Sequence, residues 1–282
     1  MTLPDVVATV PALRERVASW RGRGERIALV PTMGALHEGH LALVRRGRRE
    51  ADRVVVSIFV NPKQFAPSED FAKYPRAAER DRALLEGLAD LVFSPAPEVM
   101  YPAGFCATVS IAGPSAGFEG ALRPGHFDGV ATVVSKLFIQ VAPDVAIFGE
   151  KDWQQLQVVR RMVRDLDLPL AVIGHPIVRD EQGLALSSRN AYFSEEQLAV
   201  ARRLNGILRE TVAGLGAGDW PAKLAAARQA VAAAGLGPVD YLAVVDGETM
   251  EPRDEPSGRP ARLVAAIRLG PVRLLDNMPV PG

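Results

Sequence analysis

The sequence predicts an α/β protein in which a doubly wound, Rossmann-like parallel sheet precedes a smaller C-terminal α+β domain. Short, almost wholly apolar runs alternate with amphipathic stretches up to about Val178, a pattern typical of a parallel sheet covered by helices on both faces. Beyond that point helices come first and strands follow. Since 282 residues exceed one average domain, we expect two domains, residues 1–178 and residues 179–282.

The first domain opens with a predicted helix, because Val10, Leu13, Val17 and Trp20 recur at helical spacing. Apolar runs then predict buried strands at residues 27–31, 54–60, 91–93, 145–148 and 170–173. Amphipathic stretches between them predict helices at residues 39–50, 77–88, 130–141 and 153–166. Strands joined through helices pair in parallel, which completes the prediction of a doubly wound sheet.

The second domain has the opposite order. Its apolar spacing predicts two helices, at residues 195–215 and 221–234, and three strands, at residues 241–245, 263–267 and 272–275. Residues 251–259, rich in Pro, Asp, Glu and Gly, predict a surface loop between the first two of these strands.

The composition limits the function classes. Lys plus Arg and Asp plus Glu number 33 each, so bulk charge favours neither nucleic acid nor an anionic membrane. Cys106 is the single cysteine, which excludes an intrachain disulfide. No apolar run reaches the roughly 18 residues of a membrane span, and the first ten residues lack the basic start of a signal peptide. We therefore expect a cytoplasmic protein that binds neither nucleic acid nor membranes.

The segment PTMGALHEGH, residues 31–40, follows the first strand and leads into a helix. Ligands bind at the carboxyl ends of strands in such sheets, and a helix N-terminus there offers free backbone N–H groups to a phosphate. His37 and His40 are three residues apart, so their imidazoles are expected on one side of the helix. A zinc site or two surface histidines without a role remain alternatives, whereas the Gly-Lys-Ser/Thr ending of a Walker A loop is missing.

Three further segments carry polar groups near predicted strand ends or the domain boundary. Gln64 follows the strand that Asn61-Pro62 ends, and its alternative interpretation is an exposed glutamine in a turn. In residues 148–155, FGEKDWQQ, Lys151 suits a phosphate, while Asp152 suits either a ribose hydroxyl or a helix cap, with Gln155 one turn further on.

Ser187, Ser188 and Arg189, near the domain boundary, form the last of these segments. Two hydroxyls followed by a guanidinium suit an anion. A pair of helix-capping serines beside a solvated arginine is the alternative.

Taken together and in order, these segments resemble the motifs of the pantothenate synthetase family, within the HIGH-type nucleotidyltransferase superfamily. The matching runs are PTMGALHEGH, SIFVNPxQF, RPGHFxGV, FGEKDxQQL and GLALSSRN, which span most of residues 27–193. Two residues depart from the family pattern: Asp128 stands where arginine is frequent, and His175 where a smaller apolar residue is expected. A single histidine at that position favours packing over catalysis.

The resemblance implies an ATP-dependent ligase that joins (R)-pantoate to β-alanine through a pantoyl-adenylate and releases AMP and pyrophosphate. It also implies a homodimer, and Mg²⁺ bound mainly through the ATP phosphates with no protein metal ligand. Residues 1–178 would bind ATP and pantoate, and residues 179–282 would close as a lid.

The resemblance also implies roles for individual residues. His40, His37 and Lys151 would be catalytic; Gln64 and Gln155 would bind pantoate; Gln64 would also bind β-alanine. The expected ATP-binding residues are Met33, Gly34, Ala35, Leu36, His37, Glu38, Gly39, His40, Gly149, Glu150, Lys151, Asp152, Val178, Leu186, Ser187, Ser188 and Arg189. Two alternatives to the ligase stay open: a nucleotidyltransferase of the same fold, which would release a nucleotidyl product, and a nucleotide-binding protein without catalysis.

Overall fold

The computed structural model describes residues 2–66, 69, 71–216 and 218–281. Two compact units make up the chain: unit 1 is Met1–Glu150 with Val158–Pro176, and unit 2 is Lys151–Gln157 with Ile177–Gly282. This grouping differs from a single boundary after Val178, because the short segment Lys151–Gln157 belongs with the C-terminal residues. The difference matters for function, since that segment contains three of the expected site residues.

Unit 1 contains a six-stranded sheet whose strand pairs are all parallel, in the order β1-β4-β3-β2-β5-β6. The strands are β1 (Asp5–Val7), β2 (Ile27–Thr32), β3 (Arg53–Ile58), β4 (Leu91–Phe93), β5 (Val145–Gly149) and β6 (Ala171–His175). The predicted doubly wound parallel sheet is confirmed. Sequence analysis missed β1, because this three-residue edge strand is mostly exposed and has no apolar run.

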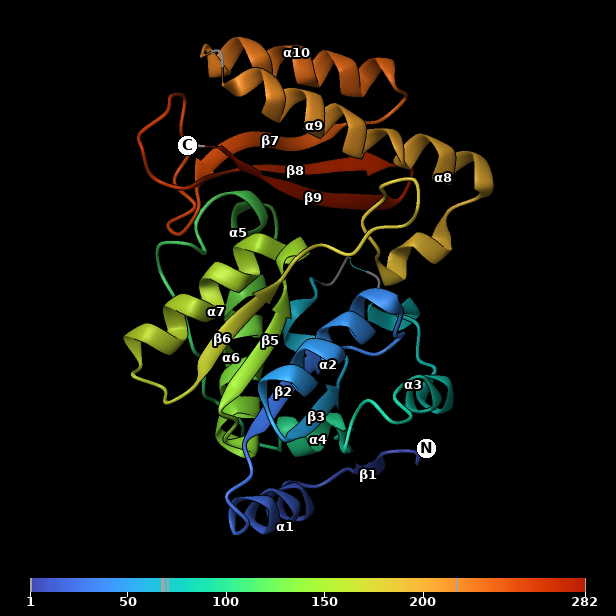
Figure 1. Ribbon diagram of the computed structural model, residues 1–282, viewed down its shortest axis with the longest axis vertical. Coiled ribbons are helices and arrows are strands. Elements are labelled where there is room, and N and C mark those ends of the chain that lie inside the picture. Colours follow the sequence, from blue (N-terminus) through green and yellow to red (C-terminus); the bar gives the residue numbers. More distant parts are fainter. Residues whose placement is uncertain (1, 67–68, 70, 217, 282) are drawn as a thin grey trace. The chain divides into compact units, whose positions relative to one another are not determined.

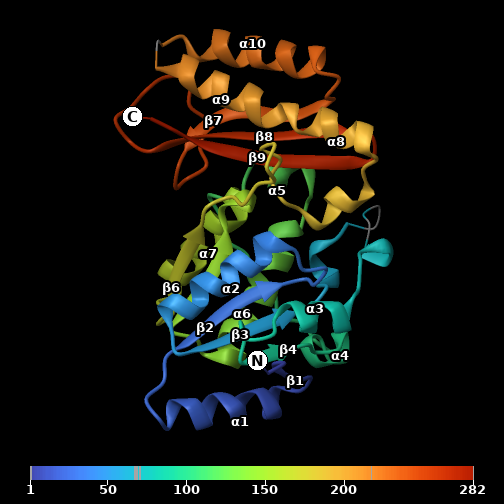
Figure 2. The same cartoon turned by 45° about the vertical axis from the view of Figure 1, so that its right-hand side comes forward.

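Helices cover both faces of this sheet. They are α1 (Val10–Arg21), α2 (Glu38–Glu50), α3 (Ala78–Leu84), α4 (Pro97–Met100), α5 (Phe118–Leu122), α6 (His126–Val141) and α7 (Trp153–Asp165). Figures 1 and 2 show α2 on one side of the strands and α6 on the other. Val30 and Val54 pack with Val44 of α2, while Leu29 and Val55, which point to the opposite face, are also fully buried. Burial on both faces explains why these strands are continuous apolar runs.

The strand order creates a topological switch point between β2 and β5. From β2 the chain proceeds outward through β3 and β4, and it then returns to place β5 and β6 on the other side of β2. Because β2 and β5 are parallel neighbours, the loops that leave their carboxyl ends start at the same edge of the sheet. Ligands of doubly wound sheets bind at this place.

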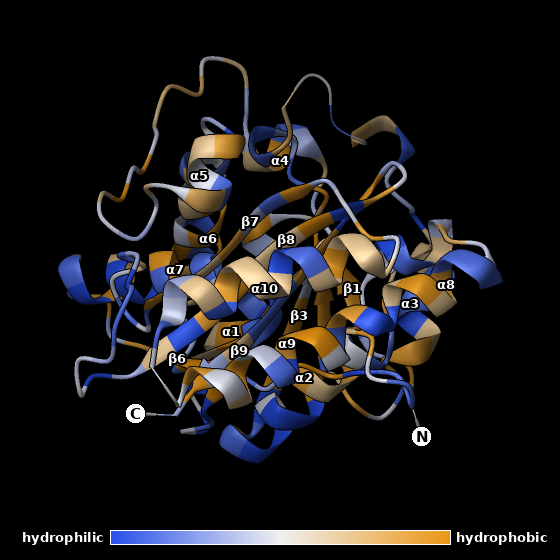
Figure 3. Ribbon diagram, turned by 90° about the horizontal axis from the view of Figure 1, so that it is seen from above, coloured by the Kyte–Doolittle hydropathy of each residue, from blue (hydrophilic) through white to orange (hydrophobic). Residues whose placement is uncertain are grey.

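Unit 2 packs helices on an antiparallel sheet, β7 (Val239–Asp246), β8 (Ala261–Leu269) and β9 (Val272–Val280). Its core joins Leu204 and Leu208 of α9 (Arg203–Leu215) to strand residues such as Leu242 and Leu263, and Figure 3 colours stretches of α9 and β8 as hydrophobic. The helix α10 (Trp220–Ala233) follows α9 in unit 2.

One predicted helix of unit 2 is wrong in detail. Residues 195–215 form two helices, α8 (Glu195–Ala201) and α9, separated only at Arg202. Arg202 keeps right-handed helical backbone angles, and its side chain donates to Asp180 at 2.8 Å. A break of one residue without Gly or Pro leaves no signal in the apolar spacing. Within the described part of the chain, no helix combines the length and apolar character needed to cross a lipid bilayer.

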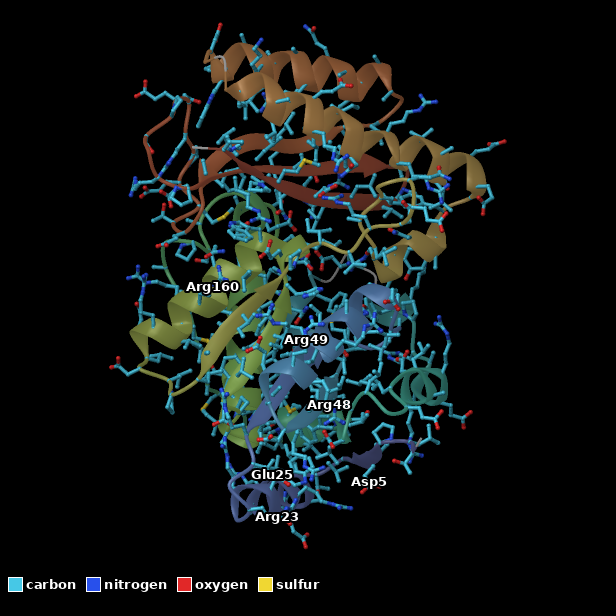
Figure 4. All side chains as sticks on the ribbon, viewed as in Figure 1. Asp5, Arg23, Glu25, Arg48, Arg49 and Arg160 are labelled. Atoms are coloured by element: carbon cyan, nitrogen blue, oxygen red, sulfur yellow. The ribbon has the colours of Figure 1, made fainter. Side chains whose placement is uncertain are left out.

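An ion-pair network at the amino ends of β2 and β3 ties unit 1 together. Arg53 donates to both carboxylate oxygens of Glu25 at 2.8 and 2.9 Å and to Asp90 at 3.0 Å. Arg23 donates to Glu25 at 3.0 Å, and Arg48 donates to Asp90 at 2.6 Å. Arg23, Glu25 and Arg48 are labelled in Figure 4.

This network predicts an acid-sensitive contribution to stability. Hydrogen bonds from Arg53 and then Arg23 lower the pKa of Glu25 to about 2. A lowered pKa means that the contribution of Glu25 is complete above its ordinary pKa of 4.5 and is lost as the pH falls toward about 2. Glu25→Gln should therefore lower the free energy of unfolding at pH 7, and the difference from wild type should shrink as the pH falls through 4. Urea unfolding over this pH range measures it, with the exposed Glu98→Gln as control; a difference independent of pH would contradict the assignment.

Candidate active site

The loop after β2 is held by a buried carboxylate from α3. The backbone N–H groups of Ala35 and Leu36 each donate to Asp81 at 2.8 Å, and Asp81 is almost fully buried. Gly34 has a φ of +85° and Ala35 a φ of +50°, so the chain turns sharply before α2 begins. The conformation of the loop thus depends on a residue 45 positions or more away in the chain.

His37 and His40 cap α2 together. His37 is the N-cap, and its Nδ1 accepts from the Gly39 N–H at 3.1 Å, while the Nδ1 of His40 accepts from the His37 N–H at 3.3 Å. Because Nδ1 accepts in both neutral rings, the proton of each ring lies on Nε2. The ring centroids are 4.1 Å apart. The two imidazoles therefore form one unit with an Nε2–H donor on each ring.

The expectation of free backbone N–H groups in this loop is wrong for four residues. Ala35 and Leu36 donate to Asp81, and His37 and Gly39 donate to the two imidazoles. These backbone groups are used to shape the loop. A phosphate at this place would therefore meet imidazole donors in preference to backbone donors.

Gln64 is the last residue of the short 3-10 helix η1 (Pro62–Gln64), which follows β3. The side-chain amide of the buried Asn61 donates to Gln64 Oε1 at 3.0 Å, and Tyr101 donates to Asn61 Oδ1 at 2.7 Å. Gln64 Nε2 in turn donates to the Met33 sulfur at 3.3 Å. This chain of hydrogen bonds orients the Gln64 amide, with its NH₂ group directed toward the loop after β2.

The backbone of Gln64 is fixed by α6 and the residues before it. Its carbonyl oxygen lies 2.8 Å from His126 Nδ1 and accepts from Arg123 at 3.2 Å. Burial, with the nearby Arg123 charge, lowers the pKa of His126, so the ring is neutral at pH 7 and Nδ1–H donates to this carbonyl. A Cβ on Gly129 of α6 would lie 2.2 Å from the Lys63 carbonyl oxygen, so only glycine lets η1 pack so closely.

Gly149 and Glu150 complete the unit 1 part of the site. Gly149 ends β5, the neighbour of β2 at the switch point, and the space beside its Cα is open. Unit 1 thus brings the carboxyl ends of β2, β3 and β5, with His37, His40, Met33, Gln64 and Gly149, to one edge of its sheet.

Unit 2 carries the other expected residues. Lys151 and Asp152 lie in the 3-10 helix η3 (Glu150–Asp152), and their side chains form an ion pair at 3.4 Å. Gln155 follows in the first turn of α7 and is half-buried. The Lys151 ammonium therefore has a counter-ion, Asp152, within its own segment. An anionic ligand would compete with Asp152 for this ammonium.

The serine segment of unit 2 is shaped by local hydrogen bonds. Ser187 is the N-cap of the 3-10 helix η4 (Ser188–Tyr192), and its hydroxyl accepts from the Arg189 N–H at 3.3 Å. The Leu186 N–H donates to the Val178 carbonyl at 2.9 Å, which pairs two of the expected ATP-binding residues. Ser187 thus has the capping role that the sequence left open, while residues 186–189 are half-buried. Among the described residues, no three His, Cys, Asp or Glu side chains gather as metal ligands.

The sequence matches the pantoate-beta-alanine ligase family over residues 5–279. The chain belongs to the pantoate–β-alanine ligase family. The pantothenate synthetase of Mesorhizobium japonicum is 55% identical over 285 aligned residues, which cover 100% of this chain and 99% of the relative. The membership confirms the ligase activity and the enzyme class that the motifs predicted.

Two solved structures of the family are similar to this chain. The pantothenate synthetase of Thermus thermophilus has a TM-score of 0.91 at 50% identity, over 99% of this chain and 100% of that one. The pantoate-beta-alanine ligase of Francisella tularensis, complexed with beta-gamma ATP and beta-alanine, has a TM-score of 0.82 at 31% identity, over 98% of this chain and 97% of that one.

The two departures from the family motifs lie in unit 1. Asp128 falls in the first turn of α6, where a negative charge suits the helix dipole. His175 ends β6 beside Gly149, and its Nδ1 is buried with no hydrogen-bond partner among the described residues. Burial and the charges of Arg49 and Arg46 on α2 lower the pKa of His175; Arg49 is labelled in Figure 4.

Sequence reasoning missed three residues that shape the site: Asp81, Asn61 as an orienting group, and Tyr101. Asp81 and Tyr101 belong to segments with no recognisable motif, and only the fold brings them to the loops. Asn61 stood within the SIFVNPxQF run, so its polar side chain beside Pro62 was a usable signal.

Proposed function

We propose that the carboxyl edge of the unit 1 sheet holds pantoate beside the α-phosphate of ATP, with His37 and His40 donating to the phosphate. The paired imidazoles support this most directly. Their Nδ1 atoms accept backbone N–H groups, so each neutral ring presents an Nε2–H donor at the switch point of the sheet. The complex of the Francisella tularensis ligase with beta-gamma ATP and beta-alanine supports the choice of ligands.

In the first half-reaction, a pantoate carboxylate oxygen bonds to the α-phosphorus of ATP. The bond between that phosphorus and the bridging oxygen of the β-phosphate breaks, and pyrophosphate leaves. A carboxylate is already ionised at neutral pH, so no general base is needed. Positioning and stabilisation of negative charge carry the step, and His40, His37 and Lys151 supply donors for it.

In the second half-reaction, the β-alanine amine nitrogen bonds to the acyl carbon of pantoyl-adenylate. The bond from that carbon to the phosphate oxygen breaks, AMP leaves, and the nitrogen loses a proton. Gln64 and Gln155 hold the pantoate part in both half-reactions. Because their amides are neutral, they leave the charge of the pantoate carboxylate, the nucleophile of the first half-reaction, intact. Gln64 also contacts β-alanine.

ATP is used as its Mg²⁺ complex, with the ion bound mainly through phosphate oxygens. We assign the remaining expected contacts to ATP. They come from Met33–Leu36, Glu38, Gly39, Gly149, Glu150, Asp152, Val178 and residues 186–189. Unit 2 closes over the substrates as a lid. We further propose a homodimer in the cytoplasm, which light scattering of the purified protein and cell fractionation test.

The deciding experiment follows AMP and pyrophosphate separately. Pyrophosphate release that needs pantoate, and AMP release that needs both pantoate and β-alanine, are expected. A nucleotidyltransferase would release pyrophosphate with no amide product, and a protein without catalysis would release neither. Either result would reject the proposal.

Replacing Gln64 by Ala is expected to raise the KM for pantoate at least tenfold and to leave the KM for ATP within about twofold. The amide that Asn61 orients would be lost, while the histidine pair would keep its contacts. Initial rates at varied pantoate and varied ATP measure the two constants. The exposed neighbour Lys63→Ala is the control; an unchanged KM for pantoate in Gln64→Ala would remove Gln64 from the site.

A further inference from the structure

The start of α7 is attached to the antiparallel sheet of unit 2 through Trp153. The indole N–H of Trp153 donates to the Gly247 carbonyl at 3.1 Å. The guanidinium carbon of Arg262 on β8 lies 3.5 Å from the centroid of the Trp153 ring, a close cation–π contact. Arg262 is buried, so this charge is withdrawn from water and depends on its partners.

Asn277 of β9 links the same arginine to Lys151. The buried Asn277 side chain accepts from Arg262 Nε at 2.5 Å and donates through Nδ2 to the Lys151 carbonyl oxygen at 2.9 Å. The Asn277 backbone N–H donates to the carboxylate of the preceding residue, Asp276, at 2.7 Å. Two polar side chains of the sheet thus hold Lys151 and Trp153, the residues on either side of Asp152.

We propose that Arg262 and Asn277 are positioning residues for Lys151. The proposal rests on the catalytic role of Lys151 given above. A lysine side chain has four rotatable bonds, and its ammonium acts at one place only if the backbone from which it starts is fixed. The hydrogen bond to the Lys151 carbonyl supplies this constraint on the backbone, while the ammonium itself contacts Asp152 at 3.4 Å.

A double-mutant cycle tests the proposal. Asn277→Ala is expected to lower kcat for pantoate-dependent pyrophosphate release about tenfold, and less than twofold in a Lys151→Ala background measured at high enzyme concentration. Arg262→Lys keeps the charge but loses the planar stack, and it should show the same dependence on Lys151. Arg268→Lys, on the same strand and paired with Asp240, is the matched control, with activity near wild type.

The outcomes separate the positioning role from the proposed function. If Lys151→Ala lowers activity but Asn277→Ala does not, or lowers it equally in both backgrounds, the positioning role is wrong and the proposed function stands. If Lys151→Ala itself keeps normal activity, the catalytic role of Lys151 and the positioning role are both wrong. Thermal unfolding checks that each variant is folded, and Arg262→Lys decides the question if Asn277→Ala does not fold.

Discussion

Replacing His40 by Ala is expected to lower the rate of adenylate formation at least a hundredfold. The Nε2–H of His40 would donate to the phosphoryl oxygens as negative charge grows on them, and loss of one such donor costs about 10²–10³ in rate. Pyrophosphate release in a single turnover measures the step without interference from product release. A His40→Ala enzyme with near-normal pyrophosphate release would exclude the assigned role.

His40 also caps α2, so a second variant has to separate stability from catalysis. Ala at this position removes the acceptor of the His37 N–H and should cost about 1 kcal/mol of stability. Glu is the usual third residue of a capping box and restores such an acceptor. His40→Glu should therefore unfold near the wild-type urea concentration while remaining inactive, because it has no donor for the phosphate.

Replacing Asp81 by Ala is expected to lower the free energy of unfolding by about 3 kcal/mol and to abolish most activity. Two buried backbone N–H groups would lose a charged acceptor, and hydrogen bonds to charged groups contribute roughly 1.5–3 kcal/mol each. The loop would lose the conformation that places His37 at the start of α2. Urea unfolding and ATP-dependent turnover measure the two effects.

Asp81→Asn supplies the graded comparison, because one carbonyl oxygen can still accept from Ala35 or Leu36. It should lose about half as much stability as Asp81→Ala. The exposed Glu79→Ala, on the same helix, should stay within about 0.5 kcal/mol of wild type. If Asp81→Ala were as stable as Glu79→Ala, the carboxylate would not be holding the loop.

The apolar runs were sufficient to predict the parallel sheet, because a strand buried on both faces has an apolar residue at almost every position. The run Ile27–Thr32 is almost continuously buried, whereas the exposed β1 has no such run. The pairing of His37 and His40 could also be predicted from the sequence, since residues three apart at a helix start lie on one side of the helix. The capping role of their Nδ1 atoms could not be predicted, because it depends on the exact residue at which the helix begins.

By itself the sequence determined the fold class, the family and the motifs that carry the chemistry, since periodicity and short motifs are local properties of the chain. Only the tertiary structure decided that Asp81 holds the loop after β2, that Tyr101 orients Asn61, and that Lys151 groups with the antiparallel sheet of unit 2. These contacts join residues separated by 40 to 126 positions. No local pattern encodes them, because each depends on which surfaces meet once both sheets have formed.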